Sequence, residues 1–201
     1  MPVSADIETG YAEDAKRVGD TVRAVLAAGA VGVNIKDALC GPDRARRGGE
    51  PLRSVVEQAE RIAAAREAVD SAGVPLFVNA RIDTYLRGTG HLAATLERAA
   101  AFLAAGADGI FVLGTVDPAT VKGLAEGVDG PLDVMAGPGA PSVAELSSLG
   151  VARISVGSGI AQAAHALVRR AARELLDTGT YESPAGGLDH DELNTLLGKG
   201  R

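Results

Sequence analysis

Three segments of the sequence place charged or carboxamide side chains at the end of a short apolar run. They are PVSADIETGY (2–11), VGVNIKD (31–37) and LFVNARID (76–83). Each is typical of a buried strand that carries polar groups at its carboxyl end. In parallel α/β folds this edge of the sheet is where ligands bind and reactions take place. The sequence therefore predicts where a site lies and which groups line it.

The first segment carries two carboxylates. Asp6 and Glu8 are two residues apart, so on a strand their side chains point to the same side. Two carboxylates at a strand end, followed by a turn at Gly10, are a plausible site for Mg²⁺. Such an ion would polarise the carbonyl of a 2-oxo acid and stabilise an enolate. The alternative is that both acids flank a helix N-terminus and interact with its dipole.

The third segment supplies a cation, Arg81, at the end of its apolar run. A guanidinium can hold a carboxylate or phosphonate through two parallel hydrogen bonds and stabilise developing negative charge. Arg81 is therefore the predicted catalytic residue. Asp83 would orient it, and Asn79 would lie on the same side if the strand continues regularly; both are predicted to bind substrate. The alternative is an Arg81–Asp83 pair with a structural role.

Amphipathic helices alternate with short β-rich runs, so these strand ends belong to a parallel sheet. Asp117-Pro118 and Ser142-x-x-Glu145 are helix-start signals. Each strand is expected to be apolar on both faces, as in parallel sheets covered by helices. We predict a TIM-type (β/α) barrel, incomplete as given, with about six of its eight strands. The expected strands are about 2–6, 31–35, 75–80, 108–113, 131–135 and 152–156.

Composition limits the kind of protein. The 201 residues are 46% hydrophobic and only 3% aromatic, so Ala, Val, Leu and Ile must form the core. A net charge of -6 gives no basic surface for nucleic acid or an anionic membrane. No apolar stretch reaches the roughly 18–20 residues that cross a bilayer, and no signal-peptide pattern opens the chain. With a single cysteine, these features favour a cytoplasmic protein with neither nucleic-acid nor membrane partners.

Two parts of the chain are expected. A barrel-type domain covers residues 1–182, and a short tail covers residues 183–201 after a Gly/Pro break. The tail carries a helix from about Asp189 to Leu197, where Asp189-x-x-Glu192 is a second capping-box pattern.

Five segments, taken in order, resemble the strand motifs of the isocitrate lyase/phosphoenolpyruvate mutase superfamily, most closely its small phosphonomutase-like members. The resemblance implies a (β/α)₈ barrel that binds Mg²⁺ and a 2-oxo acid or phosphonate. It implies an enzyme that makes or breaks a C–C or C–P bond next to the carbonyl. The segments are Asp6-Ile-Glu8-Thr-Gly10-Tyr11, VNIKD, NARID, GADGIFV and GPGAPSVAELSSLGVARISVGS.

The resemblance also implies individual roles. Asp6 would ligate the metal directly and Glu8 would act through water, while Gly10 and Tyr11 are counted with the substrate-binding residues. Relatives commonly exchange their last helix between subunits, and the predicted tail helix is compatible with a homo-oligomer.

The second segment departs from this pattern. Relatives usually carry Glu-Asp where this chain has Lys36 and Asp37, so both residues are doubtful members of the site. A lysine there would repel Mg²⁺, or pair with Asp6 or Glu8 in its place, and metal affinity would be weakened. A Lys36 side chain turned to solvent is the open alternative. Cys40 lacks the Lys-x-Cys-Gly-His setting of the family's lyases and is expected to be an incidental thiol.

Finally, the resemblance implies that the chain starts at the third strand of the barrel. The preferred function is a Mg²⁺-assisted lyase or mutase. The alternative is a truncated, inactive barrel with a structural or oligomer-partner role, and a start codon assigned too late would also explain the missing strands.

Overall fold

The computed structural model describes residues 2–39 and 51–198, so Cys40 lies outside the described residues. The chain forms two compact units, Met1–Ser155 and Val156–Arg201. The predicted boundary between residues 182 and 183 falls inside the second unit and stays a prediction.

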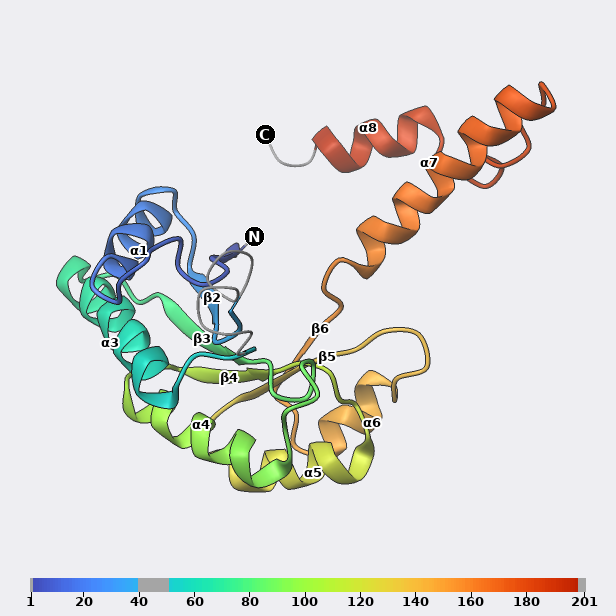
Figure 1. Cartoon of the computed structure of the whole chain (residues 1–201). Helices are drawn as coiled ribbons and strands as arrows, with labels where there is room; N and C mark the ends of the chain where they lie inside the picture. The colour runs from blue at the N-terminus through green and yellow to red at the C-terminus, as the bar shows by residue number, and fades with distance from the viewer. Residues whose placement is uncertain (1, 40–50, 199–201) are drawn as a thin grey trace. The chain divides into compact units, whose positions relative to one another are not determined.

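The first unit is built on one parallel sheet whose strands follow chain order, β1 to β6. Neighbouring strands in chain order, each pair joined through a helical connection, are the arrangement of a (β/α) barrel. Figure 1 shows the sheet curled with helices alternating along it, which confirms an incomplete TIM-type barrel. All the expected strands are present to within two residues at each end. Their bounds are β1 Ser4–Asp6, β2 Gly32–Lys36, β3 Phe77–Ile82, β4 Gly109–Val112, β5 Leu132–Met135 and β6 Arg153–Ser155.

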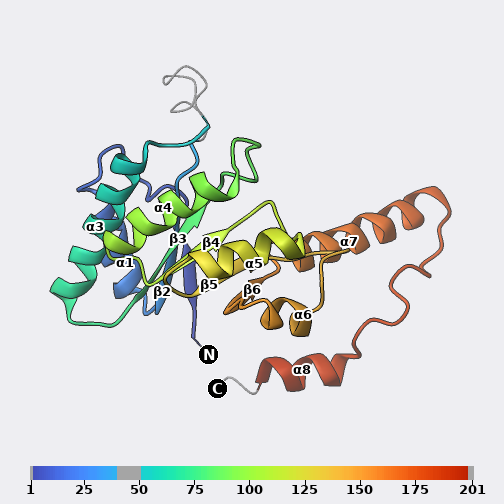
Figure 2. The same cartoon turned by 90° about the horizontal axis from the view of Figure 1, so that it is seen from below.

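The helices of this unit lie along one side of the sheet (Figures 1 and 2). Ser142 and Glu145 form the predicted capping box, and Asp117 caps a helix with Pro118 in its first turn, also as predicted. Ser54 caps another helix by accepting the backbone N–H of Glu57. The helices are α1 Val18–Ala27, α3 Val55–Ala72, α4 Leu92–Ala104, α5 Pro118–Gly127 and α6 Val143–Ser148.

The prediction that every strand is apolar on both faces is wrong. Side chains alternate along each strand; the face under the helices is apolar, whereas the other face is largely polar, with apolar exceptions such as Phe111 on β4. Its buried members are Val33, Ile35, Val78, Ala80, Ile82, Ile110, Val112, Leu132 and Val134. The opposite face carries polar residues in register, since Asn34 pairs with Asn79 and Lys36 with Arg81. In a barrel this second face lines the interior and has no helix to cover it, so polar groups are tolerated there.

The second unit contains α7 Gly159–Asp177 and α8 His190–Gly198. After α7 the chain turns around Glu174, whose carboxylate accepts hydrogen bonds from residues 180, 182 and 183. The hydrogen bond from the Ser183 side chain, followed by those from the Glu182 backbone and the Thr180 side chain, lowers the pKa of Glu174 to about 2. Asp189 precedes α8 and accepts the backbone N–H of Glu192, so the predicted tail helix is confirmed. Among the described helices, none is long and apolar enough to span a membrane.

Candidate active site

Arg81 lies at the carboxyl end of the sheet, close to Asp83 and Asp6. Its Nε donates to Asp83 Oδ1 at 2.7 Å and its Nη2 donates to Asp83 Oδ2 at 3.0 Å, a two-pronged pair. The remaining Nη1 lies 3.9 Å from Asp6 Oδ2, too far for a hydrogen bond. Asp83 is fully buried and therefore fixes the plane of the guanidinium. One edge of a rigidly held cation is thus turned toward the end of β1.

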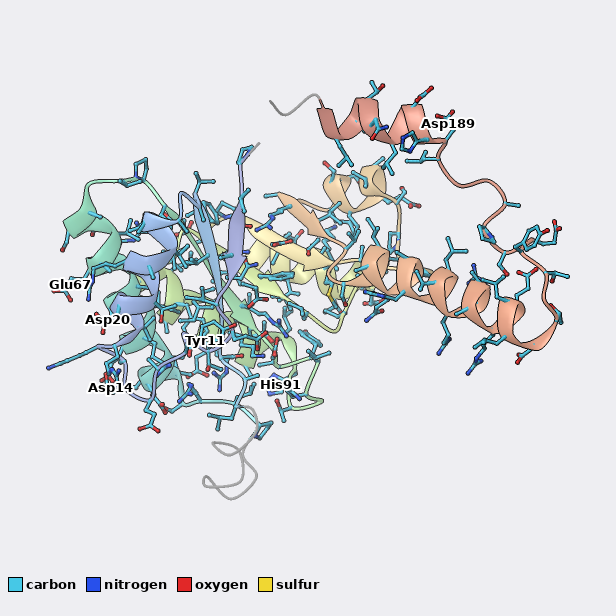
Figure 3. All side chains as sticks on the ribbon, turned by 90° about the horizontal axis from the view of Figure 1, so that it is seen from above. Tyr11, Asp14, Asp20, Glu67, His91 and Asp189 are labelled. Atoms are coloured by element: carbon cyan, nitrogen blue, oxygen red, sulfur yellow. The ribbon has the colours of Figure 1, made fainter. Side chains whose placement is uncertain are left out.

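The loop after β1 carries Glu8, Gly10 and Tyr11 in left-handed backbone conformations. Their φ values are 54°, 90° and 48°, which are uncommon for residues other than glycine. At Gly10 a Cβ would also lie 2.9 Å from Val18 Cγ2, so only glycine fits. Tyr11 is exposed (Figure 3). The buried guanidinium of Arg61, from α3, donates to the carbonyls of residues 9, 12 and 13 and holds this loop in place.

Lys36 and Glu8 form an ion pair between Nζ and Oε2. The two residues are joined a second time, because the backbone N–H of Lys36 donates to the carbonyl of Glu8 at 2.8 Å. Lys36 is buried, with a side chain only 9% exposed, while Glu8 remains 47% exposed. The structure therefore corrects one alternative: Lys36 is not turned to solvent, and it lies beside Arg81 on the neighbouring strand.

The residues predicted to bind Mg²⁺ do not fit a divalent ion. Glu8 faces an ammonium, and Asp6 accepts the backbone N–H of Glu8 at 2.8 Å while its other oxygen faces Arg81. A divalent cation here would meet two resident cations and carboxylates already engaged by them. Across residues 2–39 and 51–198, moreover, no group of three or more His, Cys, Asp or Glu side chains could hold a metal ion.

The Asp37 side chain points to the face of the sheet that the helices cover, opposite to the face that carries Lys36 and Arg81. Its Oδ1 accepts the backbone N–H of Asp83 at 2.9 Å, and its Oδ2 lies 3.1 Å from Nη1 of Arg98 on α4. Burial raises the pKa of Asp37 to about 6, although the Asp83 N–H and Arg98 act in the opposite direction. Asp37 thus positions the residue that orients Arg81.

Asn79 lies on the interior face of the barrel, two residues before Arg81 on the same strand. Its amide nitrogen donates to Asn34 Oδ1 at 2.9 Å and to Asp133 Oδ2 at 3.1 Å. Arg153 Nη1 approaches the same Asp133 oxygen at 3.4 Å. These contacts join β2, β3, β5 and β6 through polar side chains. A role for Asn79 in substrate binding stays a prediction.

A separate cavity of about 560 Å³ opens at the same edge of the sheet, between the loops after β2 and β3 and the helices α3 and α4. The polar residues that line it are Arg53, Ser54, Thr84, Thr89 and Arg98. It is the nearest alternative place for a small anion to bind.

Residues 1–176 match the phosphoenolpyruvate phosphomutase family. The chain belongs to this family. Among proteins similar in sequence is an uncharacterized protein of Mycobacterium tuberculosis, 35% identical over 170 residues that cover 82% of this chain and 59% of that protein. The 2-methylisocitrate lyase of Escherichia coli is 32% identical over 66% of this chain and 43% of its own length.

Solved structures give the same result. A Burkholderia cenocepacia protein described as a lyase/mutase matches with a TM-score of 0.89 and 34% identity, over 98% of this chain and 70% of that one. A phosphonopyruvate hydrolase solved with oxalate and Mg²⁺ matches with a TM-score of 0.79 and 26% identity, over 99% and 69%. A 2,3-dimethylmalate lyase, described as a member of the phosphoenolpyruvate mutase/isocitrate lyase superfamily, matches with a TM-score of 0.78 and 26% identity, over 98% of this chain and 66% of that one. The chain spans about 59% of the length of the first curated relative.

Sequence reasoning on this family member missed Asn34, Asp133, Arg153 and Arg98. The signal for the first two was present: VNIK and VNAR alternate apolar and polar residues with a period of two, and LDVM places a single polar residue between two apolar ones. Arg98 gave no such signal, because an arginine on an amphipathic helix is normally solvated. Its burial depends on Asp37, which is 61 residues away in sequence.

Replacing Asp133 with asparagine should change the pH dependence of stability. Burial raises the pKa of Asp133 from 3.8 to about 6, despite the lowering effects of Arg153 and Asn79. The folded state thus binds this proton more tightly than the unfolded state does. The stabilisation that this bound proton gives the folded state is fully present below about pH 4 and is lost as the pH rises through about 6. As the pH rises from about 4 to about 6, the free energy of unfolding of Asp133→Asn should therefore increase by up to about 3 kcal/mol relative to that of the native chain.

Urea unfolding at a series of pH values measures this difference. Asp129→Asn, at an exposed position, is the matched control and should show no such trend. A constant difference between Asp133→Asn and the native chain across the pH range would contradict the prediction.

Proposed function

We propose that this chain is a lyase or mutase that acts on a small 2-oxo acid or phosphonate. The bond that breaks or forms is a C–C or C–P bond next to the carbonyl. When it breaks, its electron pair stays on the carbon next to the carbonyl, as an enolate. The observation that carries the proposal is Arg81, held by Asp83 with its Nη1 edge directed toward Asp6. A guanidinium in this position would bind the acidic group of the substrate.

Mg²⁺ was expected to assist this reaction, and the phosphonopyruvate hydrolase solved with oxalate and Mg²⁺ supports a metal site in that relative. In this chain Lys36 engages Glu8. The proposed function therefore assigns every step to the protein's own groups and none to a metal.

The alternative, an inactive barrel with a structural role, is not favoured, because Asp6, Glu8, Arg81 and Asp83 still meet at one sheet edge. A homo-oligomer stays part of the proposal. The second unit supports it, since α7 exposes apolar residues at helical spacing, among them Ile160, Val168 and Leu175. A cytoplasmic location likewise stays a prediction.

Calorimetric titration with oxalate tests the proposed function. Oxalate has the charge and planar shape of an enolate joined to a carboxylate, so it should bind saturably. Acetate, with a single carboxylate, is the control and should bind far more weakly. Release of a 2-oxo acid from 2-methylisocitrate and from phosphonopyruvate would then be measured to identify the reaction. Absence of saturable oxalate binding, with Mg²⁺ and without it, would overturn the proposal.

A further inference from the structure

Lys36 occupies a position that a lysine seldom holds without a functional reason. Its side chain is only 9% exposed, and an ammonium removed from water costs free energy unless it is paired. The pair with Glu8 compensates this cost. The same pair depends on a left-handed Glu8, a conformation that carries strain in any residue other than glycine. The buried ammonium and the strained backbone both occur at the predicted active site, where strain and buried charge are usually linked to function.

The register of the sheet places Lys36 beside Arg81. The two are direct partners on β2 and β3, so their side chains leave the sheet on the same face, on strands roughly 4.8 Å apart. Two cations at that spacing repel each other unless anions lie between or around them. Glu8 pairs with Lys36 and Asp83 pairs with Arg81, while Asp6 Oδ2 lies 3.9 Å from Arg81 Nη1. Two neighbouring cations, each paired with a carboxylate, are suited to a ligand that carries two negative groups.

We propose that the Lys36 ammonium is the resident cation of this site and that the chain binds its dianionic ligand without a divalent metal. This inference rests on the proposed function. Arg81 holds the acidic group of the ligand, and Lys36 donates a hydrogen bond to the enolate oxygen. The electron pair of the broken bond is delocalised onto that oxygen. No proton leaves Lys36 in this step, so the ammonium only stabilises the enolate charge. When a C–C bond breaks, the hydroxyl proton of the other fragment passes to water and that fragment leaves as a carbonyl compound; when a C–P bond breaks, the phosphoryl group passes to water. Solvent then protonates the enolate carbon.

Glu8 has a different role here from that of a metal-binding carboxylate. Its carboxylate pairs with the Lys36 ammonium and directs its Nζ, and Glu8 is held in turn by the backbone bond from Lys36 to the Glu8 carbonyl. Glu8 is thus a positioning residue, acting through Lys36. Lys122, which is 61% exposed and pairs with Glu126 on α5, provides a matched lysine outside the site.

Calorimetry of the full chain with oxalate, in excess EDTA and in saturating Mg²⁺, tests the inference without any substitution. The native chain should bind oxalate equally well in both, and Mg²⁺ alone should give no saturable heat. Lys36→Met should weaken oxalate binding by roughly 10- to 100-fold, the usual value of a charge-assisted hydrogen bond. Lys122→Met should leave it unchanged. Lys36→Glu should bind oxalate only when Mg²⁺ is added.

The outcomes separate the two proposals. Oxalate binding by the native chain only in the presence of Mg²⁺, or tight binding of Mg²⁺ alone, would overturn the role of Lys36 and leave the proposed function in place. No oxalate binding under either condition would overturn both. Thermal unfolding of each variant checks that it is folded. Where a variant is unfolded, oxalate binding by the native chain in EDTA and in Mg²⁺ still decides whether the site needs a metal.

Discussion

Arg81→Lys will weaken the binding of oxalate by roughly 30- to 5000-fold, because altering one partner of a buried, hydrogen-bonded charge pair costs roughly 2–5 kcal/mol. Lysine keeps the charge but has no planar fork. It can reproduce neither the two bonds to Asp83 nor the open Nη1 edge. In the substrate reaction the same change should raise KM more than it lowers kcat, since the acidic group that Arg81 holds carries its charge before the bond breaks.

The matched control is Arg23→Lys, at an arginine that is 56% exposed and paired with Asp20 on the surface of α1. Its affinity for oxalate should equal that of the native chain. If Arg81→Lys and Arg23→Lys bind oxalate alike, Arg81 is a structural residue, which is the alternative that the sequence left open.

Asp37→Ala will lower the free energy of unfolding by about 3–5 kcal/mol, the usual cost of leaving one member of a buried ion pair alone. The substitution removes the partner of Arg98 and the acceptor of the Asp83 N–H. The Arg98 side chain is only 14% exposed and Asp83 is fully buried, so water replaces the carboxylate poorly. Urea unfolding at neutral pH, where Asp37 is ionised in the native chain, measures the loss.

Asp20→Ala provides the contrast. It also removes an aspartate from an arginine pair, but that pair is exposed and should contribute at most about 1 kcal/mol. Asp37→Asn keeps an acceptor for the Asp83 N–H and should lie between the two. Equal losses for Asp37→Ala and Asp20→Ala would show that the buried pair does not stabilise the fold.

Much of the fold could be predicted because its signals are local. Asp117-Pro118 and Ser142-x-x-Glu145 begin helices where the sequence placed them, and the strand positions follow from short apolar runs between glycine stops. The prediction of two apolar faces failed for a physical reason. It treated the sheet as covered on both sides, whereas the residues around Asn79 line a barrel interior.

The site was harder to predict, since its decisive contacts join distant parts of the chain. The pairing of Arg81 with Asp83 is local and was foreseen as an orienting contact. The direction of Lys36 depends on the left-handed turn at Glu8, and that turn is held by Arg61 from about 50 residues away. Sequence spacing contains no information on such contacts. It could offer only two alternatives for Lys36, pairing or solvent.

The central claim is that Arg81 and Lys36 together form a metal-independent site for a small dianion. A crystal structure of the full chain with oxalate, grown in excess EDTA, tests it most directly. We expect one carboxylate of oxalate within hydrogen-bond distance of Arg81 Nη1 and the other within reach of Lys36 Nζ. Oxalate bound instead in the cavity beside Ser54 and Arg98, or bound at Asp6 only when Mg²⁺ is present, would contradict the account.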